Sequence, residues 1–392
     1  MGNAYSPFCL RPVKKADFPF AIFPLPLFPF STSHFPLLIE GVAGEGSSRG
    51  EWVHRREWVH RRELMANEKF KMANGKSPLP FHPFPFSPFP VSPFFSYHPY
   101  MPREWHISKG RTLPLGERTL VMGVLNVTPD SFSDGGEFFS FESALAHAEQ
   151  MIAAGADIID IGGESTRPGG AAIVSVDEEL NRVLPVIEKL AKRSAIPISI
   201  DTTKASVARA ALDAGAAIVN DISALRFDSQ IADEVAKSGA GLVLMHSRGT
   251  PGALHGLAPV ADIIEEVTSS LRSSIALAAQ RGVKRESIVI DPGIGFGKSQ
   301  EQNIELIAKL DQLIAAFPDF PLLIGTSRKS FLGRILADAN GNAAPVEQRL
   351  HGSMASLTAA VLKGARIVRV HDVKAAVETI QVIDAVKVSH KL

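Results

Sequence analysis

The 392-residue sequence has a single cysteine, no excess charge and no long apolar run. With Cys9 alone, an intrachain disulfide and a metal site built from several cysteines are excluded. The 41 basic and 41 acidic residues give a formal net charge of zero, so nothing indicates a nucleic-acid or anionic-membrane partner. No run of ~20 apolar residues is present, which argues against a transmembrane helix. We therefore expect a cytoplasmic protein in which any bound anion is held by local cations and backbone donors.

The first hundred residues have a composition unlike that of the rest of the chain. They hold 14 of the 23 Phe and 15 of the 27 Pro residues, largely interleaved, as in residues 81–86. Proline at this density removes backbone donors and interrupts helices, so no packed element is expected. A tandem hexapeptide, residues 51–56 and 57–62, has too few copies for a solenoid. We predict a low-complexity, disordered segment over residues 1–110 and a folded domain over residues 111–392.

Three interpretations of this N-terminal segment remain open: a targeting peptide, an aromatic-rich interaction tail, or sequence upstream of a true start at Met101. Prolines interrupt the apolar stretch that a signal peptide requires, and no Arg- and Ser-rich amphipathic helix is visible. We expect residues 1–100 to be dispensable for folding and activity.

From about residue 115, apolar runs of strand length alternate with helical stretches. Each run is continuous, as is typical of strands covered on both faces. The runs are residues 120–126, 157–162, 197–201, 218–222, 241–246, 287–291, 321–326 and 367–371. Eight such units in roughly 280 residues have the size of a (β/α)8 barrel. The sequence therefore predicts an α/β fold, a TIM barrel, with a doubly wound open sheet as the alternative.

Local signals support the helices between the runs. Residues 140–155 have helical spacing, begin with serine and end with glycine. Two pairs, Ser175 with Glu178 and Ser299 with Gln302, have the spacing of a capping box. In that motif each side chain satisfies the other residue's backbone N–H at a helix start.

Polar side chains fall at or just after the ends of the apolar runs. They are Asn126, Asp201, Asn220, Asp221, His246, Asp291, Arg328, Lys329, Arg369 and His371. In a barrel the carboxyl ends of all strands share one rim, where active sites lie. Residues spread over roughly 250 positions would therefore become neighbours.

Structural explanations compete with a functional one at these positions. Asp201 could cap the next helix, whereas Asn220 and Asp291 are common turn residues. The basic residues 328–329 could form a solvated patch, and Arg369 could pair with carboxylates.

Six segments occur in a fixed order after residue 110. They read LNVTPDSFSDGG (125–136), GESTRPG (163–169), IDT (200–202), DPGIGFGK (291–298), SRKSFLG (327–333) and IVRVHD (367–372). Together they resemble the dihydropteroate synthase family, over roughly the last two-thirds of the chain. The resemblance implies a pterin-binding barrel and a transferase of folate biosynthesis. That enzyme joins 6-hydroxymethyl-7,8-dihydropterin pyrophosphate to p-aminobenzoate, gives 7,8-dihydropteroate and pyrophosphate, and is a sulfonamide target.

By resemblance, the pterin contacts Asp201, Asn220, Asp291, Lys329 and Phe296. Carboxylates and an amide suit the ring's N–H and amino groups. Asp201 would also stabilise positive charge that develops on the heterocycle. Phe296, which lies between two glycines, would be a lid over the substrates, with a core position as the alternative. By resemblance, the catalytic residues are Asp201, Lys329, Arg369 and His371.

The leaving pyrophosphate is assigned by resemblance to Asn126, Thr166, Arg369 and His371, the last two as a cationic pair beside a helix start. Mg²⁺ bound to it would contact Asn126 and Asp134, because magnesium takes oxygen ligands and keeps several waters. p-Aminobenzoate is assigned to the residues of two loops and one helix start: Phe132, Thr166, Arg167, Pro168 and Ser330. The loop after the fifth run fits the family more loosely, so Met245 and His246 have no assigned role.

Small-molecule substrates are the expected partners, without nucleic acid or membrane, and the resemblance implies a homodimer. Two other functions remain as alternatives. A pterin-binding methyltransferase could use the same barrel but would not need segments 163–169 and 327–333. A non-catalytic binding barrel would show a broken site, whereas every expected polar position is filled.

Overall fold

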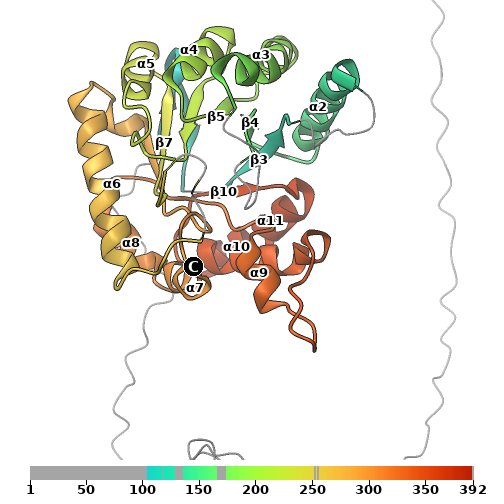
Figure 1. Ribbon diagram of the computed structural model, residues 1–392, viewed down its shortest axis with the longest axis vertical. Helices are drawn as coiled ribbons and strands as arrows, with labels where there is room; N and C mark the ends of the chain where they lie inside the picture. The colour runs from blue at the N-terminus through green and yellow to red at the C-terminus, as the bar shows by residue number, and fades with distance from the viewer. Residues whose placement is uncertain are drawn as a thin grey trace, which may run out of the picture. The chain divides into compact units, whose positions relative to one another are not determined.

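The computed structural model in Figure 1 describes residues 104–116, 118–128, 136–165, 174–250, 253 and 256–390. These residues all belong to one compact unit. The unit consists of eight parallel strands surrounded by helices, with a short antiparallel hairpin before the first parallel strand. Residues 1–103 lie outside the described part of the chain, so the prediction made for them stays a prediction.

The eight parallel strands form a nearly closed barrel. They are β3 (Leu120–Asn126), β4 (Ile158–Gly162), β5 (Ile198–Asp201), β6 (Ile218–Asp221), β7 (Gly241–Met245), β8 (Ile288–Asp291), β9 (Leu323–Ile324) and β10 (Ile367–Val370). Strand β3 pairs with both β4 and β10, and β9 pairs with β10. A single bridge, Ile290 with Leu322, joins β8 to β9 and closes the circle. The predicted TIM barrel is confirmed, and the open sheet is wrong.

Helices cover the outside of the barrel. They are α2 (Gly136–Ala153), α3 (Val176–Arg193), α4 (Ala205–Ala214), α5 (Ile231–Ser238), α6 (Ile263–Gln280), α7 (Gln300–Ala308), α8 (Leu310–Ala316), α9 (Ser330–Ile335), α10 (Leu350–Leu362) and α11 (Val373–His390). In α3 the buried residues Val183, Val186, Ile187 and Leu190 follow helical spacing, so one face meets the sheet. Figure 1 shows the helices arranged around the strands.

The two predicted capping boxes have different outcomes. At the start of α7 the box is complete: Ser299 accepts from the backbone N–H of Gln302, whose side chain accepts in return. At the start of α3 only half forms, because Ser175 accepts from the N–H of Glu178 while the Glu178 carboxylate pairs with Arg182. A nearby cation therefore competes for the carboxylate that the box requires.

The interior of the barrel has an apolar layer toward the amino-terminal ends of the strands. Residues that fill it are Leu120, Met122, Ile158, Ala217, Ile218, Val243, Val289, Leu323 and Ile367. Since side chains alternate along a strand, the next residue on the same inner face lies two positions later. Those next residues include Asp160 after Ile158, Asp291 after Val289 and Arg369 after Ile367. An apolar floor thus supports a charged layer.

A hairpin of β1 (Glu104–Ile107) and β2 (Arg111–Pro114) packs under that floor. Trp105 is fully buried there, and its indole Nε1 donates to the Ser287 carbonyl over 2.8 Å. A Cβ at Gly241 would approach the Trp105 ring and Ile107 to 3.0 Å, so this close approach requires glycine. The predicted boundary between residues 110 and 111 falls between the two paired strands of this hairpin. Two apolar residues beside a proline-rich tract are too short a signal to reveal it.

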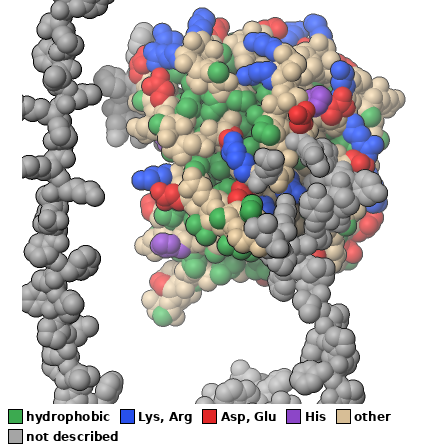
Figure 2. Space-filling model, turned by 180° about the vertical axis from the view of Figure 1, so that it is seen from behind, with side chains coloured by type: hydrophobic (Ala, Val, Ile, Leu, Met, Phe, Trp, Pro, Cys, Tyr) green, Lys and Arg blue, Asp and Glu red, His purple; other side chains and the backbone are tan. Residues whose placement is uncertain are grey.

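On the face shown in Figure 2, both Lys or Arg and Asp or Glu side chains are visible among the described residues, and several Lys and Arg side chains lie along its upper edge. Among the described helices, none combines the length and the hydropathy that a membrane crossing requires.

We expect two truncations to separate the hairpin from the segment before it. Removing residues 1–100 should leave the free energy of unfolding of the barrel unit unchanged, because β1 stays intact. Removing residues 1–110 should lower it by at least about 3 kcal/mol, the scale for losing a buried Trp side chain. Urea unfolding of both proteins measures the difference. Equal stability of the two would contradict the role given to the hairpin.

Candidate active site

The carboxyl ends of the strands surround a pocket of about 360 Å³. Register places its polar groups side by side: Asn126 pairs with Gly162, Gly162 with Asp201, and Asp201 with Asn220. The residues lining it are Val124, Asn126, Thr128, Glu164, Ser165, Asp201, Gly295, Phe296, Gly325, Ser327, Arg328, Lys329, Ser330, Val346, Arg349, Arg369 and His371. The predicted convergence on one rim is therefore what the structure shows.

Arg369 lies at the centre of the charged layer. Its Nε donates to Asp160 Oδ2 and one terminal nitrogen, Nη2, donates to Asp201 Oδ2, each over 2.6 Å. Burial lowers the pKa of Arg369, but the charges of Asp160 and Asp201 more than offset this and raise it. The guanidinium is thus permanently charged and shared by two carboxylates. Arg369 therefore does pair with carboxylates, as the structural explanation of this residue predicts.

Two carboxylates beside Arg369, those of Asp201 and Asp291, ionise less readily than usual. Burial raises the pKa of Asp201 to about 7, with Arg369 opposing the rise and Asp160 and Glu179 adding to it. Burial likewise raises the pKa of Asp291 to about 6, against a 2.7 Å hydrogen bond from the Gly293 N–H. Neither side chain caps a helix: α4 begins after Lys204, without a side-chain cap.

Lys329 faces these carboxylates from the residue before α9. Burial and the neighbouring Arg369 lower its pKa to about 8, while Asp291 and Asp201 act in the opposite direction. Its Nζ lies 4.0 Å from the centre of the Phe296 ring, a cation–π distance. A solvated basic patch at residues 328–329 is wrong, because Arg328 instead pairs with Asp372.

His371 follows β10 and lines the same pocket. Its backbone N–H and its Nδ1 both lie 3.2 Å from Ser327 Oγ. Burial, followed by the charges of Arg369, Arg328 and Lys329, lowers its pKa to about 3. This lowering favours the neutral imidazole, so the assignment of Arg369 and His371 as a cationic pair for pyrophosphate stays a prediction. Three nearby cations make a fourth charge unfavourable.

Asn220 and Phe296 occupy buried positions beside the charges. Asn220 is 2% exposed, and its Nδ2 donates to Asp160 Oδ2 over 3.1 Å. Phe296 is 5% exposed and packs with Ile222 and Met245. Phe296 is therefore an apolar wall of the pocket and belongs to a small core, the alternative to a lid. Met245, the last residue of β7, belongs to the same small core but does not line the pocket.

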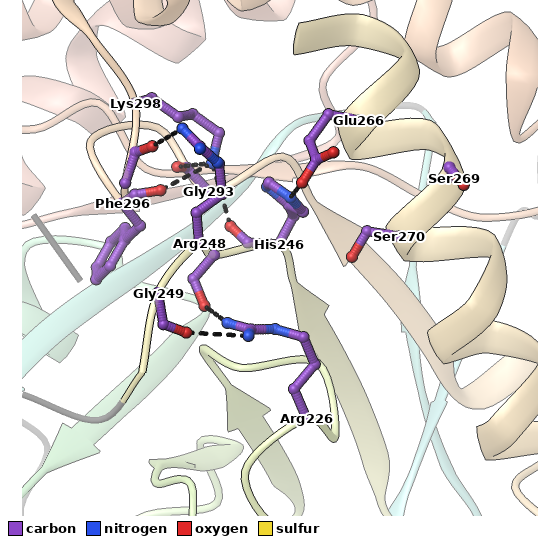
Figure 3. Close-up of polar contacts among 12 residues, drawn as sticks. Arg226, His246, Arg248, Gly249, Glu266, Ser269, Ser270, Gly293, Phe296 and Lys298 are labelled. Atoms are coloured by element: carbon purple, nitrogen blue, oxygen red, sulfur yellow. Dashed lines mark hydrogen bonds and ion pairs between the residues drawn. The ribbon is translucent and has the colours of Figure 1, made fainter. Parts of the chain in front are cut away.

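The loops after β7 and β8 are held by cations that donate to backbone carbonyls (Figure 3). Lys298 Nζ donates to the carbonyls of Gly293 and Phe296 at 2.8 and 3.1 Å, and to that of His246 at 3.3 Å. Burial lowers the pKa of Lys298 to about 7. His246 itself is buried, and burial together with Lys298 lowers its pKa to about 2. His246 does not line the pocket, and its Nε2 lies 4.0 Å from Glu266 Oε1.

Several predicted site residues lie outside the described part of the chain. They are Phe132, Asp134, Thr166, Arg167 and Pro168. The described neighbours of the second loop are firmly held. Arg182 Nη1 donates to the Gly163 carbonyl over 2.6 Å, and Lys204 Nζ donates to Glu164 and Glu179, both over 2.6 Å.

Asp160 and Lys204 are site neighbours that the sequence analysis missed. Asp160 is fully buried in β4 and contacts both Arg369 and Asn220. A charged residue inside a continuous apolar strand is itself a signal, since charges are rarely fully buried unless paired. Lys204 offered no comparable signal, because lysine near a helix start is ordinary.

An α/β barrel with acids, a lysine and an arginine in a pocket at its carboxyl rim defines a class, the (β/α)8 enzymes that bind polar small molecules. The family model described as pterin binding enzyme matches residues 122–371. The dihydropteroate synthase of Synechocystis sp. is 49% identical over 277 residues, 70% of this chain and 93% of that protein. The enzyme of Bacillus subtilis is 46% identical over 278 residues, 71% of this chain and 92% of that protein.

A solved structure gives the same result. The Xanthomonas albilineans dihydropteroate synthase with 4-aminobenzoic acid has a TM-score of 0.65 and 44% identity. The match covers 72% of this chain and 98% of that one. The chain belongs to the dihydropteroate synthase family of pterin-binding enzymes.

We expect Asp201→Asn to remove a pH dependence of stability. An unfolded carboxyl ionises near ~4, whereas folded Asp201 ionises near pH 7. A group whose folded pKa is raised stabilises the fold fully below the unfolded pKa and loses that contribution as pH rises through the folded pKa. Wild type should therefore lose stability relative to Asp201→Asn between those values, by roughly 1.4 kcal/mol per unit of pKa difference.

Urea unfolding at a series of pH values measures this effect. Ser199→Ala, a neutral buried change on the same strand, serves as the control and should follow the wild-type slope. Parallel curves for wild type and Asp201→Asn would show that Asp201 ionises normally in the folded protein.

Proposed function

We propose that this chain is a dihydropteroate synthase, a transferase that joins 6-hydroxymethyl-7,8-dihydropterin pyrophosphate to p-aminobenzoate and releases pyrophosphate. The observation that carries the proposal is one pocket that holds Asp201, Lys329, Arg369 and His371, with Asp291 buried beside them. Family membership at 44–49% identity supports the same reaction.

The buried acids suit a pterin ring. A ring rich in N–H and amino groups presents donors, and Asp291 and Asp201 are acceptors when ionised. Pterin donors would favour the ionised carboxylates and so lower the raised pKa values of both. Asn220 adds an amide, and Lys329 a donor for the ring carbonyl. Phe296, which packs on Met245, supplies an apolar wall for the ring.

The bond that breaks joins the pterin methylene carbon to the pyrophosphate oxygen, and its electron pair leaves with the pyrophosphate. Arg369 and His371 receive the growing negative charge: Arg369 as a cation, His371 as a hydrogen-bond donor whose pKa an anion would raise. Ionised Asp201 stabilises the positive methylene carbon. The amine nitrogen of p-aminobenzoate then bonds to that carbon and loses a proton to solvent or to the departing pyrophosphate.

Magnesium fits the donor set near Arg369. Asn126 lines the pocket with an amide oxygen, and hard oxygen ligands suit this ion. Among the described residues, no group of three or more His, Cys, Asp or Glu side chains could hold a metal. Asn126 and Asp134 would therefore hold Mg²⁺ together with substrate oxygens and water. When bound, the ion neutralises charge on the pyrophosphate.

p-Aminobenzoate is placed by this proposal near Ser330, the first residue of α9 and a lining residue of the pocket. Thr166, Arg167, Pro168 and Phe132 remain assigned to it by resemblance. A homodimer, a cytoplasmic location and inhibition by sulfonamides likewise remain predictions that accompany the proposed activity.

We expect Mg²⁺-dependent release of pyrophosphate that requires both substrates, since the amine must trap the methylene cation. A coupled pyrophosphate assay with each component omitted in turn measures this. Release without p-aminobenzoate, or no release with both substrates, would remove the synthase proposal. Methyl transfer from a methylated pterin to a corrinoid acceptor would favour the methyltransferase alternative.

Arg369→Ala should weaken inorganic pyrophosphate binding by about 10- to 100-fold, the scale for hydrogen bonds to a charged group. p-Aminobenzoate binding should change by less than about 3-fold, because Arg369 touches the leaving group only. Isothermal titration with each ligand measures both affinities. Arg334→Ala, which removes an exposed cation from α9, is the control. Equal weakening of both ligands would contradict the assignment.

A further inference from the structure

Asp160 is a buried carboxylate that the reaction above does not use. It is 0% exposed and lies on the inner face of β4, above the apolar floor. One oxygen, Oδ2, accepts from both Arg369 Nε, at 2.6 Å, and Asn220 Nδ2, at 3.1 Å. Its other oxygen, Oδ1, has no hydrogen-bond partner among the described residues, nor has Oγ of Ser199, the neighbour with which Asp160 is in register.

A purely structural role explains this arrangement poorly. Burying an ion pair costs desolvation that the pairing often fails to recover, and apolar residues of similar volume are frequently more stabilising. An orphan carboxylate oxygen adds to that cost. Ile158, two residues earlier on the same face, shows that the barrel interior accepts an aliphatic side chain one layer below. The charge at position 160 therefore points to the two side chains that it holds.

We propose that Asp160 is a positioning residue: it is the fixed anchor of Arg369 and Asn220, while Asp201 is the partner that Arg369 exchanges for substrate. The inference rests on the proposed function, because it concerns how the pyrophosphate- and pterin-binding side chains are oriented.

The two carboxylates that share Arg369 differ in access to the pocket. Asp201 lines the pocket and binds the terminal nitrogen Nη2, whereas Asp160 does not line it and binds Nε. Nε is attached to the aliphatic stem, so holding it fixes the plane of the guanidinium. A ligand entering the pocket competes with Asp201 for the terminal nitrogens and leaves the bond to Asp160 in place.

Asp160 also fixes the orientation of the Asn220 amide. An ionised carboxylate only accepts hydrogen bonds, so Asn220 must turn its NH₂ group toward Asp160. The Asn220 carbonyl oxygen is then directed away from Asp160 and is the atom left to accept from a ring N–H. Replacement of the carboxylate by an amide removes that constraint, because an amide can either donate or accept.

Asp160 influences the ionisation of Asp201 as well. The groups that act on Asp201 are Arg369 and Lys329, which favour its charge, and Asp160 and Glu179, which oppose it. Removing the Asp160 charge should therefore lower the pKa of Asp201. Because the ionised form of Asp201 is the active one, the acid limb of the pH–activity profile should move to lower pH.

Asp160→Asn tests the proposal, with Ser199→Ala as a buried, neutral neighbour control. We expect Asp160→Asn to weaken inorganic pyrophosphate binding about 10- to 100-fold, the range for a hydrogen bond to a charged group. The KM for p-aminobenzoate should change by less than about 3-fold. Combined with Arg369→Ala, Asp160→Asn should add less than about 3-fold, because non-additivity marks residues that act through each other.

A merely structural role makes different predictions. Loss of packing would lower activity toward both substrates together, add to the effect of Arg369→Ala, and leave the acid limb where it is in wild type. Any of these results overturns the positioning role. The positioning role is supported if the acid limb of the pH–activity profile shifts in Asp160→Asn and does not shift in Ser199→Ala.

Wild-type protein provides a second measurement if Asp160→Asn does not fold. The Nε–Hε group of Arg369, assigned in a ¹⁵N NMR spectrum by comparison with Arg369→Lys, should remain protected from solvent exchange when inorganic pyrophosphate is added. Loss of protection would show that Asp160 is exchanged like Asp201. The coupled pyrophosphate assay on wild type is independent: its failure removes the synthase proposal, whereas the anchor is judged from the Nε–Hε signal alone.

Discussion

The guanidinium of Arg369, shared by Asp160 and Asp201 inside a closed barrel, is the interaction on which the pocket depends. Without that cation, two carboxylates would face each other with little water, and ionising both of them would cost free energy. Asp291 is a third acid beside this cation, and Lys329 and Lys298 are two further bases. Three acids and three bases therefore balance one another. The pKa values near 6 to 8 follow from burial, and they leave each group sensitive to the charge of a ligand.

The fold stabilises this charged layer by placing it between two different surroundings. Below it, aliphatic side chains and the Trp105 hairpin close the amino-terminal end of the barrel. Above it, the pocket opens at the carboxyl rim. Water can therefore reach the charges from one side only, and a ligand that enters there displaces it. Electrostatic interactions strengthen as water leaves, which is how a site of this kind acquires binding strength for an anionic leaving group.

Much of the fold could be predicted because parallel strands buried on both faces are continuous apolar runs. All eight runs became strands, with ends within a few residues of the prediction. The position of Asn126, Asp201 and Asn220 on the rim could then be predicted, since the carboxyl ends of the strands in a barrel share one side. That residues 328–329 lie at the pocket could be predicted only from the family resemblance, because no local pattern distinguishes a buried lysine from a solvated one.

The rest could not be predicted because it depends on neighbours distant in sequence. The pKa of His371 is lowered first by burial and then by the charges of Arg369, Arg328 and Lys329, and no local pattern reports their approach. Phe296 is an apolar wall because it packs on Met245, at the end of β7, and on Ile222, which follows β6. The hairpin was missed because its two buried residues, Trp105 and Ile107, form too short a pattern beside prolines.

The two sides of the rim are held by different physical means, which has a consequence for the chemistry. On the β7–β8 side, Lys298 and Arg248 donate to backbone carbonyls, and these hydrogen bonds hold the shape of the loops. On the β4–β5 side, Lys204 bridges two carboxylates, Glu164 of the pocket lining and buried Glu179. Glu179 also opposes ionisation of Asp201. A change at Glu164 would therefore reach Asp201 through the Lys204 bridge, whereas a change at Lys298 would reach Asp291, whose pKa Lys298 lowers. Each side of the rim thus acts on a different acid of the charged layer.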